Sequence, residues 1–281
     1  MRTFLIVITL FALGAIFLFI RNKPSFSNSD SIVLFKQNKT EGTSENNFVV
    51  VKDGHLSVNG QRKRFWAAVG KVYAKANVFP NDNPQQIKEK VALSRKSTQL
   101  ILDRLEIMGF NAVRLWDGFM DVDYEKGDGS TADCADFFIA EAKKRGFKIW
   151  CAGMNRNGAV KPDDVGIIDG PETSEAWKEA VAEMLKESRS EENGWELRNN
   201  LAVFWDDRLE ALTTRNKQKV VAHFNHHTGL RWCDDDAFAV WELSNEEWWI
   251  RRMLGGSWQK LPDFFRQSLL KKWHLFLFKK I

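Results

Sequence analysis

LDRLEIMGFNAVRLW, residues 102–116, and FFIAEAKKRGFKIWCAG, residues 137–153, decide the fold of this chain. In both stretches an amphipathic helical pattern ends at a glycine, and an apolar run with the composition of a strand follows at once. A helix followed by a strand, repeated along the chain, indicates a parallel sheet with helices between its strands. We therefore expect an α/β fold, with helices at 98–109 and 132–145 and strands at 111–116 and 147–153.

Further strands are predicted on either side of these units. Asp53-Gly54 and Asn59-Gly60 have the composition of tight hairpin turns, and they precede an apolar strand at 65–70. A fourth core strand follows at 238–243, after an unusually long excursion at 154–236. Helices are expected at 174–188, 207–225 and 262–278. Because a closed barrel of this type needs eight strands, the prediction is an incomplete (β/α)8 TIM barrel of about four β/α units, or else a smaller open sheet.

The first 47 residues are predicted to lie outside this fold. Residues 3–20, TFLIVITLFALGAIFLFI, contain no charged side chain and are followed by Arg21 and Lys23. This pattern predicts a signal anchor or a signal peptide over residues 1–23, and hence an exported protein that is either membrane-anchored or, after cleavage, secreted or periplasmic. Residues 24–47 have the composition of a flexible linker, and residues 48–281 form the predicted barrel domain.

Composition excludes several classes of protein. With 44% hydrophobic and 28% charged residues, the chain is not mainly disordered, and its net charge of +4 is spread along the sequence, so nucleic acid is not a predicted partner. Three cysteines without C-x-x-C spacing do not suit a disulfide-dense scaffold or a cysteine zinc site. His226 and His227 stand near three aspartates, but adjacent histidines do not easily bind one ion, so we predict neither a metal nor a cofactor.

Aromatic content and strand ends point to carbohydrate. The chain has 12 Trp and only 2 Tyr, and flat indole rings pack well on the C–H faces of sugars. Catalytic residues of barrels follow the carboxyl ends of strands, which here are Arg114-Leu115-Trp116-Asp117, residues 153–157 and residues 241–249. The last reads WELSNEEWW and places an amide, carboxylates and indoles directly after an apolar strand.

Four segments resemble the cellulase-like branch of the large clan of retaining (β/α)8 glycoside hydrolases that contains cellulases, β-mannanases and β-galactosidases. They are GHLSVNGQRKRFWAAVG at 54–70, LDRLEIMGFNAVRLW at 102–116, AKKRGFKIW at 142–150 and NHHTGLRWCDDDAFAVWELSNEEWW at 225–249. The last segment is the most specific. The resemblance implies an enzyme that cleaves β-linked polysaccharides or oligosaccharides with retention of configuration.

The resemblance also implies roles for particular residues. Glu246 matches the acid/base carboxyl after the fourth strand, Asn245 the asparagine that binds a sugar hydroxyl, and Arg114 the arginine that holds the nucleophile. The predicted substrate-binding side chains are Trp116, Asn155, Trp248 and Trp249. Trp66, Trp150 and Trp241 lie inside strands and are expected in the core, and Glu242 is expected to make a structural hydrogen bond.

One element of the family pattern has no counterpart in this chain. A retaining enzyme needs two carboxyl groups about 5–5.5 Å apart. The family's nucleophile follows the seventh strand, whereas this sequence ends after the helix that follows its fourth. We therefore expect this chain to be inactive alone, either as a fragment of a longer glycosidase or as a truncated carbohydrate-binding or remnant protein.

Overall fold

The computed structural model describes residues 47–70, 72–116, 124–152, 154, 160–161, 164, 174–187, 201–243, 245 and 253–279. The predicted anchor or signal segment and the linker up to residue 46 lie outside these residues. Within the described ranges, none of the helices combines the length and the apolar character that crossing a bilayer requires.

The two predicted hairpins are present. Strands β1 (Val50–Lys52), β2 (His55–Val58) and β3 (Gln61–Arg62) form an antiparallel sheet in that order. Asp53 and Asn59 adopt φ values of 50° and 51°, and the glycine after each has a positive φ as well. Two consecutive residues with positive φ make the two-residue turn whose twist suits a hairpin, which is why Asp-Gly and Asn-Gly occur here.

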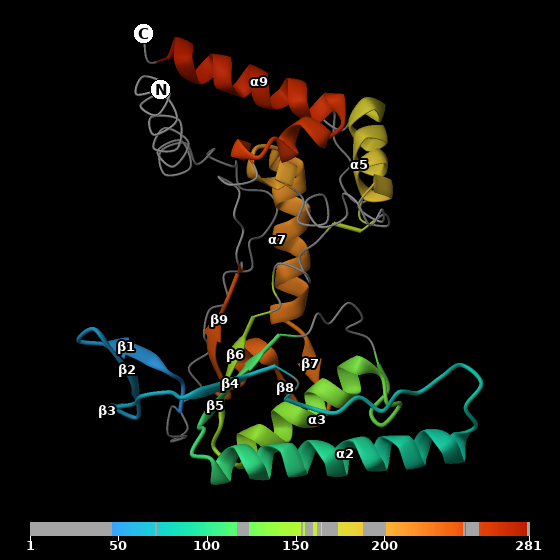
Figure 1. Cartoon of the computed structure of the whole chain (residues 1–281). Coiled ribbons are helices and arrows are strands. Elements are labelled where there is room, and N and C mark those ends of the chain that lie inside the picture. Colours follow the sequence, from blue (N-terminus) through green and yellow to red (C-terminus); the bar gives the residue numbers. More distant parts are fainter. Residues whose placement is uncertain are drawn as a thin grey trace. The chain divides into compact units, whose positions relative to one another are not determined.

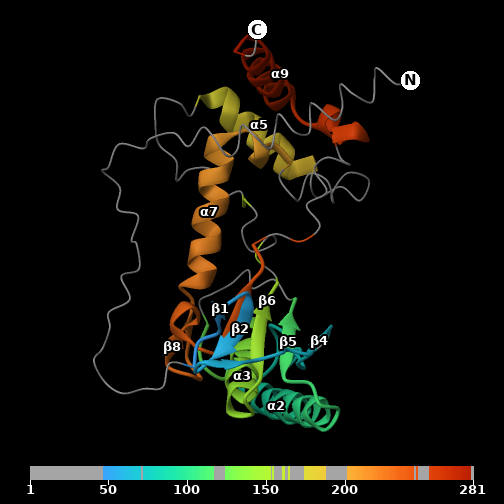
Figure 2. The same ribbon diagram turned by 90° about the vertical axis from the view of Figure 1, so that its left-hand side faces the viewer.

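The predicted parallel α/β sheet is confirmed. Strands β4 (Ala67–Val69), β5 (Ala112–Leu115), β6 (Lys148–Cys151) and β9 (Phe238–Trp241) are neighbours in that order, and each pair is parallel. Figure 2 shows β5 and β6 running in the same direction. The carboxyl ends of these strands therefore share one edge of the sheet, as expected for the site of a βα fold.

Helices α2 (Pro84–Ile107) and α3 (Thr131–Lys144) lie side by side (Figure 1). The predicted start of α2 at residue 98 was wrong, because the helix begins at Pro84. Asn83 accepts a hydrogen bond from the Gln86 N–H, and the Gln86 side chain accepts one from the Asn83 N–H. This capping box, with proline in the first turn, is a local signal for a helix start. The prediction used only the apolar period at 98–109 and so placed the start too late.

The two faces of the parallel sheet differ in burial. Val113, Leu115, Ile149 and Cys151 are at most 1% exposed and pack in one core with side chains of α2 and α3. On the other face, which carries alternate residues of the same strands, Val69 is 63% exposed. Parallel sheets are usually covered on both faces.

A bulge lies between β6 and β9. Ile149 pairs with Phe238, but Trp150 pairs with Val240, so Ala239 is an extra residue in β9. Phe238 and Trp241 consequently face the same side, and their rings stack at 4.8 Å. Val240 shares the opposite face with Trp150.

The long excursion contains the predicted helices α5 (Glu175–Glu187) and α7 (Asp207–Val221), with the 3-10 helix η2 (Leu201–Phe204) between them. The helix predicted at 207–225 was too long, because the chain turns after Val221 into a hairpin of β7 (Phe224–Asn225) and β8 (Leu230–Arg231). The remaining elements are η3 (Trp232–Asp234), η4 (Ser257–Lys260) and the predicted last helix, α9 (Asp263–Phe278).

A second core lies among α5, η2, α7 and α9. Its fully buried side chains include Trp177, Met184, Leu209 and Phe265, each 0% exposed. Helix α7 contributes to both cores, since Leu209 belongs to the second and Val220 to the first.

Candidate functional site

Arg114 is the centre of a polar cluster at the carboxyl end of the parallel sheet. It is the third residue of β5, and its guanidinium binds the Glu242 carboxylate, with Nη2 at 2.6 and 2.8 Å from the two oxygens and Nε at 3.1 Å from Oε2. The side chains of Arg114 and Glu242 are 20% and 14% exposed. Charge-assisted hydrogen bonds of this kind are about twice as strong as neutral ones.

Asn245 is the third member of the cluster. Its Oδ1 accepts a hydrogen bond of 2.8 Å from Arg114 Nη2. The structure thus brings together two of the residues that the sequence predicts for the site, Arg114 and Asn245, although their predicted roles stay predictions.

Two indoles flank the guanidinium of Arg114. Its Cζ lies 4.4 Å from the centre of the Trp116 ring and 5.2 Å from that of the Trp150 ring. A planar guanidinium between aromatic faces is held by cation–π attraction as well as by its hydrogen bonds. The arginine is therefore fixed in place, and aromatic surface lies on the same side of the sheet.

Strand register explains why these side chains meet. Arg114 pairs with Trp150, and Trp150 pairs with Val240, so all three share one face. Side chains two residues apart in a strand point the same way. Trp116 and Glu242 each lie two residues beyond this row, at the strand ends, and so reach the same space.

Four of the predicted site residues cannot be placed. Glu246, Asn155, Trp248 and Trp249 lie outside the described residues. Their assignment remains a prediction from the sequence.

The structural hydrogen bond expected of Glu242 is confirmed, but its place in the Arg114 cluster was not predicted. Regular alternation from the buried Phe238 would have sent its side chain to the helix-covered face, and only the bulge at Ala239 reverses this. The placement of Trp150 in the core was wrong for a related reason. Trp150 pairs with Arg114, so its side chain points to the same face of the sheet as Arg114, and it is 37% exposed.

The other two strand tryptophans differ from each other. Trp241 packs against the first core, as predicted. Trp66 is 66% exposed and contacts Phe110 edge-on, so its predicted burial was wrong. It precedes β4 and thus lies at the amino end of that strand, away from the carboxyl ends.

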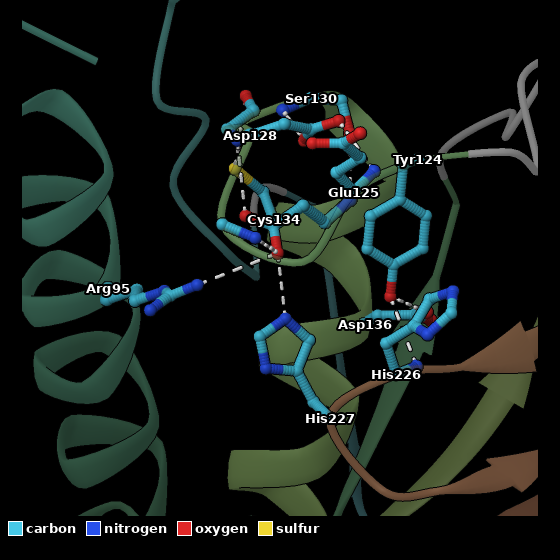
Figure 3. Close-up of polar contacts among 12 residues, drawn as sticks. Arg95, Tyr124, Glu125, Asp128, Ser130, Cys134, Asp136, His226 and His227 are labelled. Atoms are coloured by element: carbon cyan, nitrogen blue, oxygen red, sulfur yellow. Dashed lines mark hydrogen bonds and ion pairs between the residues drawn. The ribbon is translucent and has the colours of Figure 1, made fainter. Parts of the chain in front are cut away.

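A second polar cluster surrounds Asp136 of α3, which is 0% exposed. Figure 3 shows Tyr124 beside Asp136. Its Oδ2 accepts a 2.5 Å hydrogen bond from the Tyr124 hydroxyl and lies 2.8 Å from His223 Nε2. Its Oδ1 accepts a hydrogen bond from Trp232 Nε1 at 2.9 Å. Burial, together with the hydrogen bond to Asp136, raises the pKa of Tyr124 far above its usual value. These buried groups fasten α3 to the segment around β7 and β8.

Asp133, one turn earlier, binds the same segment. Its Oδ1 lies 2.8 Å from His227 Nε2 and accepts a hydrogen bond from the Gly127 N–H, and Arg95 approaches it from α2 (Figure 3). Burial by itself would raise the pKa of Asp133, but the hydrogen bonds from His227 and Gly127 outweigh it and lower that pKa. His227 of the NHHTG segment therefore holds this segment against α3.

The three aspartates before β9 make turn and ion-pair contacts. Asp235 accepts a hydrogen bond from the Ala237 N–H. Lys143 forms ion pairs of 2.8 Å with both Asp235 and Asp236. Asp234 forms an ion pair with Arg231. In the ranges that the structure describes, no three His, Cys, Asp or Glu side chains are grouped so that they could hold a metal ion.

This chain shows only a limited similarity to known proteins. No protein-family model and no curated protein matches this chain. Among solved structures, a glycoside hydrolase family 5 mannosidase from Rhizomucor miehei is similar at 12% sequence identity with a TM-score of 0.42, over 72% of this chain and 49% of the mannosidase. The chain thus spans about half the length of that protein. The likeness concerns the backbone alone.

Proposed function

We propose that this chain is the N-terminal part of a glycoside hydrolase of the cellulase-like branch, and that the carboxyl edge of β5, β6 and β9 binds a β-linked glycan. The observation that carries the proposal is the cluster at Arg114. An arginine at the end of a parallel strand, bound to Asn245 and close to the Trp116 and Trp150 rings, combines a rigid polar group with aromatic surface. Carbohydrate-binding sites combine aromatic surface for the sugar ring with fixed polar groups for its hydroxyls.

Within this proposal Glu246 is the acid/base residue. In the sequence it follows Asn245, a member of the Arg114 cluster, directly. Protonation of the leaving oxygen by one carboxylic acid and attack by a second carboxylate form a glycosyl-enzyme, which water then resolves. The resemblance assigns Glu246 to the first task and assigns no residue of these 281 to the second. Residues 3–20 support export, with this segment as an anchor or a signal.

A second candidate function, glycan binding without turnover, is favoured by one contact. The resemblance assigns Arg114 to a nucleophile, but here Glu242 accepts three hydrogen bonds from its guanidinium. The Glu242 carboxylate thus binds the Arg114 guanidinium, which would otherwise hold the nucleophile. This arrangement suits a surface that binds sugar and does not cleave it.

Binding is tested first, by titration calorimetry of the full chain with cello- and manno-oligosaccharides. Trp116→Ala and Trp150→Ala should each weaken binding about two- to twelvefold, the effect of losing one aromatic contact of about 0.5–1.5 kcal/mol. Trp66→Ala is the matched control, since this exposed indole lies at the amino end of β4. If no oligosaccharide binds, or if all three variants lose binding equally, the proposed site is wrong.

Turnover separates the two candidate functions. The full chain is assayed on β-glucan, β-mannan and aryl β-glycosides, beside Glu246→Gln and the adjacent control Glu247→Gln. Hydrolysis that is lost only in Glu246→Gln supports the enzyme. Binding with no hydrolysis supports the second candidate.

A further inference from the structure

A pocket of about 520 Å³ lies at the amino end of the parallel sheet, opposite to the carboxyl end that holds the Arg114 cluster. The start of β6, the residues that precede β5 and β9, and the first hairpins enclose it. Its lining includes Val58, Phe65, Asn111, Phe147, Lys148 and Asp236. Neither candidate function above uses this cavity, which we call the Lys148 pocket.

The side chain of Lys148 is held by backbone carbonyls. It is 14% exposed, and its Nζ donates hydrogen bonds to the carbonyl oxygens of Asn47 at 2.9 Å and Asp236 at 2.6 Å. The Asp236 carboxylate is farther away, with Oδ2 at 3.8 Å, which exceeds hydrogen-bond distance. An ammonium group has three N–H donors, whereas a neutral amine has two and a lone pair. The two carbonyls therefore satisfy the neutral amine completely.

The surroundings of Lys148 also favour its neutral form. Burial lowers the pKa of Lys148 below its usual value, and the positive charge of Lys143 acts in the same direction. Asp236 and Asp235 act in the opposite direction, but each of them forms an ion pair of 2.8 Å with Lys143, and burial prevails. Lys63 adds a further positive charge to the lining. At neutral pH more of Lys148 is therefore the nucleophilic amine than of an exposed lysine.

We propose that Lys148 is a reactive amine, which captures small apolar aldehydes in the Lys148 pocket as a protonated imine. Lysine amines in apolar surroundings are the nucleophiles with which proteins form imines. Val58, Phe65 and Phe147 give the pocket an apolar wall. This wall favours an aldehyde with an aromatic or aliphatic body over a strongly hydrated one.

The reaction uses only the aldehyde and a proton from solvent. The lone pair of Lys148 Nζ forms a bond to the aldehyde carbon, the carbonyl oxygen leaves as water with both amine hydrogens, and the proton binds the nitrogen of the new C=N bond. The resulting iminium keeps one N–H for one of the two carbonyls, and the Asp236 carboxylate is a nearby opposite charge. Capture at Lys148 does not depend on glycan binding at the other end of the sheet.

Reductive trapping of the full chain tests the proposal. Benzaldehyde and cyanoborohydride at pH 7 convert each iminium to a stable benzylamine, and peptide mapping by mass spectrometry gives the rate at each lysine. Lys148 should be labelled at least about fivefold faster than Lys52, an exposed lysine of β1. Its labelling should also rise at a lower pH. Lys148→Arg keeps the charge and N–H donors, and it should lose the label at this position while its glycan binding and the labelling of Lys52 stay unchanged.

The pocket wall provides a second test. Phe65→Ala should slow benzaldehyde labelling of Lys148 at least about threefold and change labelling by formaldehyde less than about twofold, because only the aromatic aldehyde uses the wall. Phe79→Ala is the matched control, since Phe79 is 62% exposed and does not line the pocket. Urea unfolding of both variants verifies that they are folded. The proposal is overturned if Lys148 is labelled no faster than Lys52, or if Phe65→Ala and Phe79→Ala behave alike.

Discussion

Arg114 shows how much of this site depends on one side chain. Its guanidinium joins β5 to the residues after β9 through Glu242 and Asn245, and its faces lie near two indoles. Because an arginine is always charged, these partners offset the free-energy cost of partly burying the Arg114 guanidinium. A substitution of any one partner therefore changes the interactions of Arg114 with the others.

Glu242→Gln should therefore destabilise the fold. The substitution leaves the charge of Arg114 without its counter-ion, and we expect a loss of about 1–3 kcal/mol, below the 3–5 kcal/mol of fully buried pairs because both groups retain some exposure. The free energy of unfolding is measured in urea. Combining Glu242→Gln with Arg114→Met should cost less than the sum of the single changes, whereas strict additivity would show that the pair is not coupled.

Glu141 gives the chain a defined sensitivity to acid. Burial alone would raise its pKa, but hydrogen bonds from Lys144, Arg145 and Gln99 prevail and lower the pKa to about 2. Since this value lies below the ordinary one, the stabilisation is complete above about pH 4.5 and is lost as the pH falls towards 2. Solvent around the exposed Lys144 screens part of it, so we expect on the order of 1–3 kcal/mol.

Urea unfolding at a series of pH values checks this expectation. Glu141→Gln should be less stable than the unaltered chain at pH 7 and equally stable near pH 2. Glu106→Gln, at an exposed position of α2, serves as the control and should change the pH profile little. Parallel curves for the unaltered chain and Glu141→Gln would show that Glu141 does not cause the acid sensitivity.

At the scale of elements, α3 is attached to the β7–β8 hairpin by buried hydrogen bonds. Asp136 accepts bonds from Tyr124 and Trp232 and contacts His223, while Asn225 binds the Asp136 carbonyl. Such a network is stabilising only while every member is satisfied. Buried polar contacts thus help to hold the hairpin against α3.

Asp136→Asn should loosen this attachment. The amide keeps the shape of the carboxylate but turns one acceptor into a donor that faces another donor, at an expected cost of about 2–4 kcal/mol. Asp128→Asn, in the loop before α3, is a control of the same chemistry outside the Asp136 network. Hydrogen exchange should accelerate within Phe224–Arg231 in the first variant and not in the second. Equal protection in both would exclude this role for Asp136.

The elements were largely predictable from the sequence, and the site only in part. Helix periods and the Asp-Gly and Asn-Gly turns are local signals, so α3, the first hairpins and the parallel strands were foreseen. The direction of Glu242 was not, because it depends on a bulge between β6 and β9, two strands far apart in the sequence that meet where Ile149 pairs with Phe238. The roles of His223 and His227 likewise arise from contacts with α3 that no local pattern records.

At the scale of the molecule, α7 links two separate apolar cores. Leu209 and Leu212 near its start belong to the core with α5 and α9, and Val220 near its end belongs to the core of the parallel sheet. Between these points the helix buries the polar Asn216 and no apolar side chain, and Thr214 is exposed. Cooperative unfolding of the two cores therefore depends on the integrity of this helix.

Thr214→Pro should uncouple the two cores. Proline removes a backbone hydrogen bond and clashes with the preceding turn, at about 3 kcal/mol in a helix interior. We expect two separated transitions in calorimetry where the unaltered chain shows one. Thr214→Ala, which favours the helix, should leave a single transition, and a single transition in the proline variant as well would refute the coupling through α7.

The extra residue in β9 has a consequence for how such a sequence can change. Glu242 faces Arg114 because Val240 pairs with Trp150 and Trp241 with Cys151; if Ala239 paired with Trp150 instead, Glu242 would turn away from Arg114 and Trp241 would move to the exposed face. Insertions and deletions are absorbed readily by loops but not by a strand in this position. A lineage that preserves this site is therefore free to vary the length of the segments around β9, while Val240 and Trp241 must keep their pairing with β6.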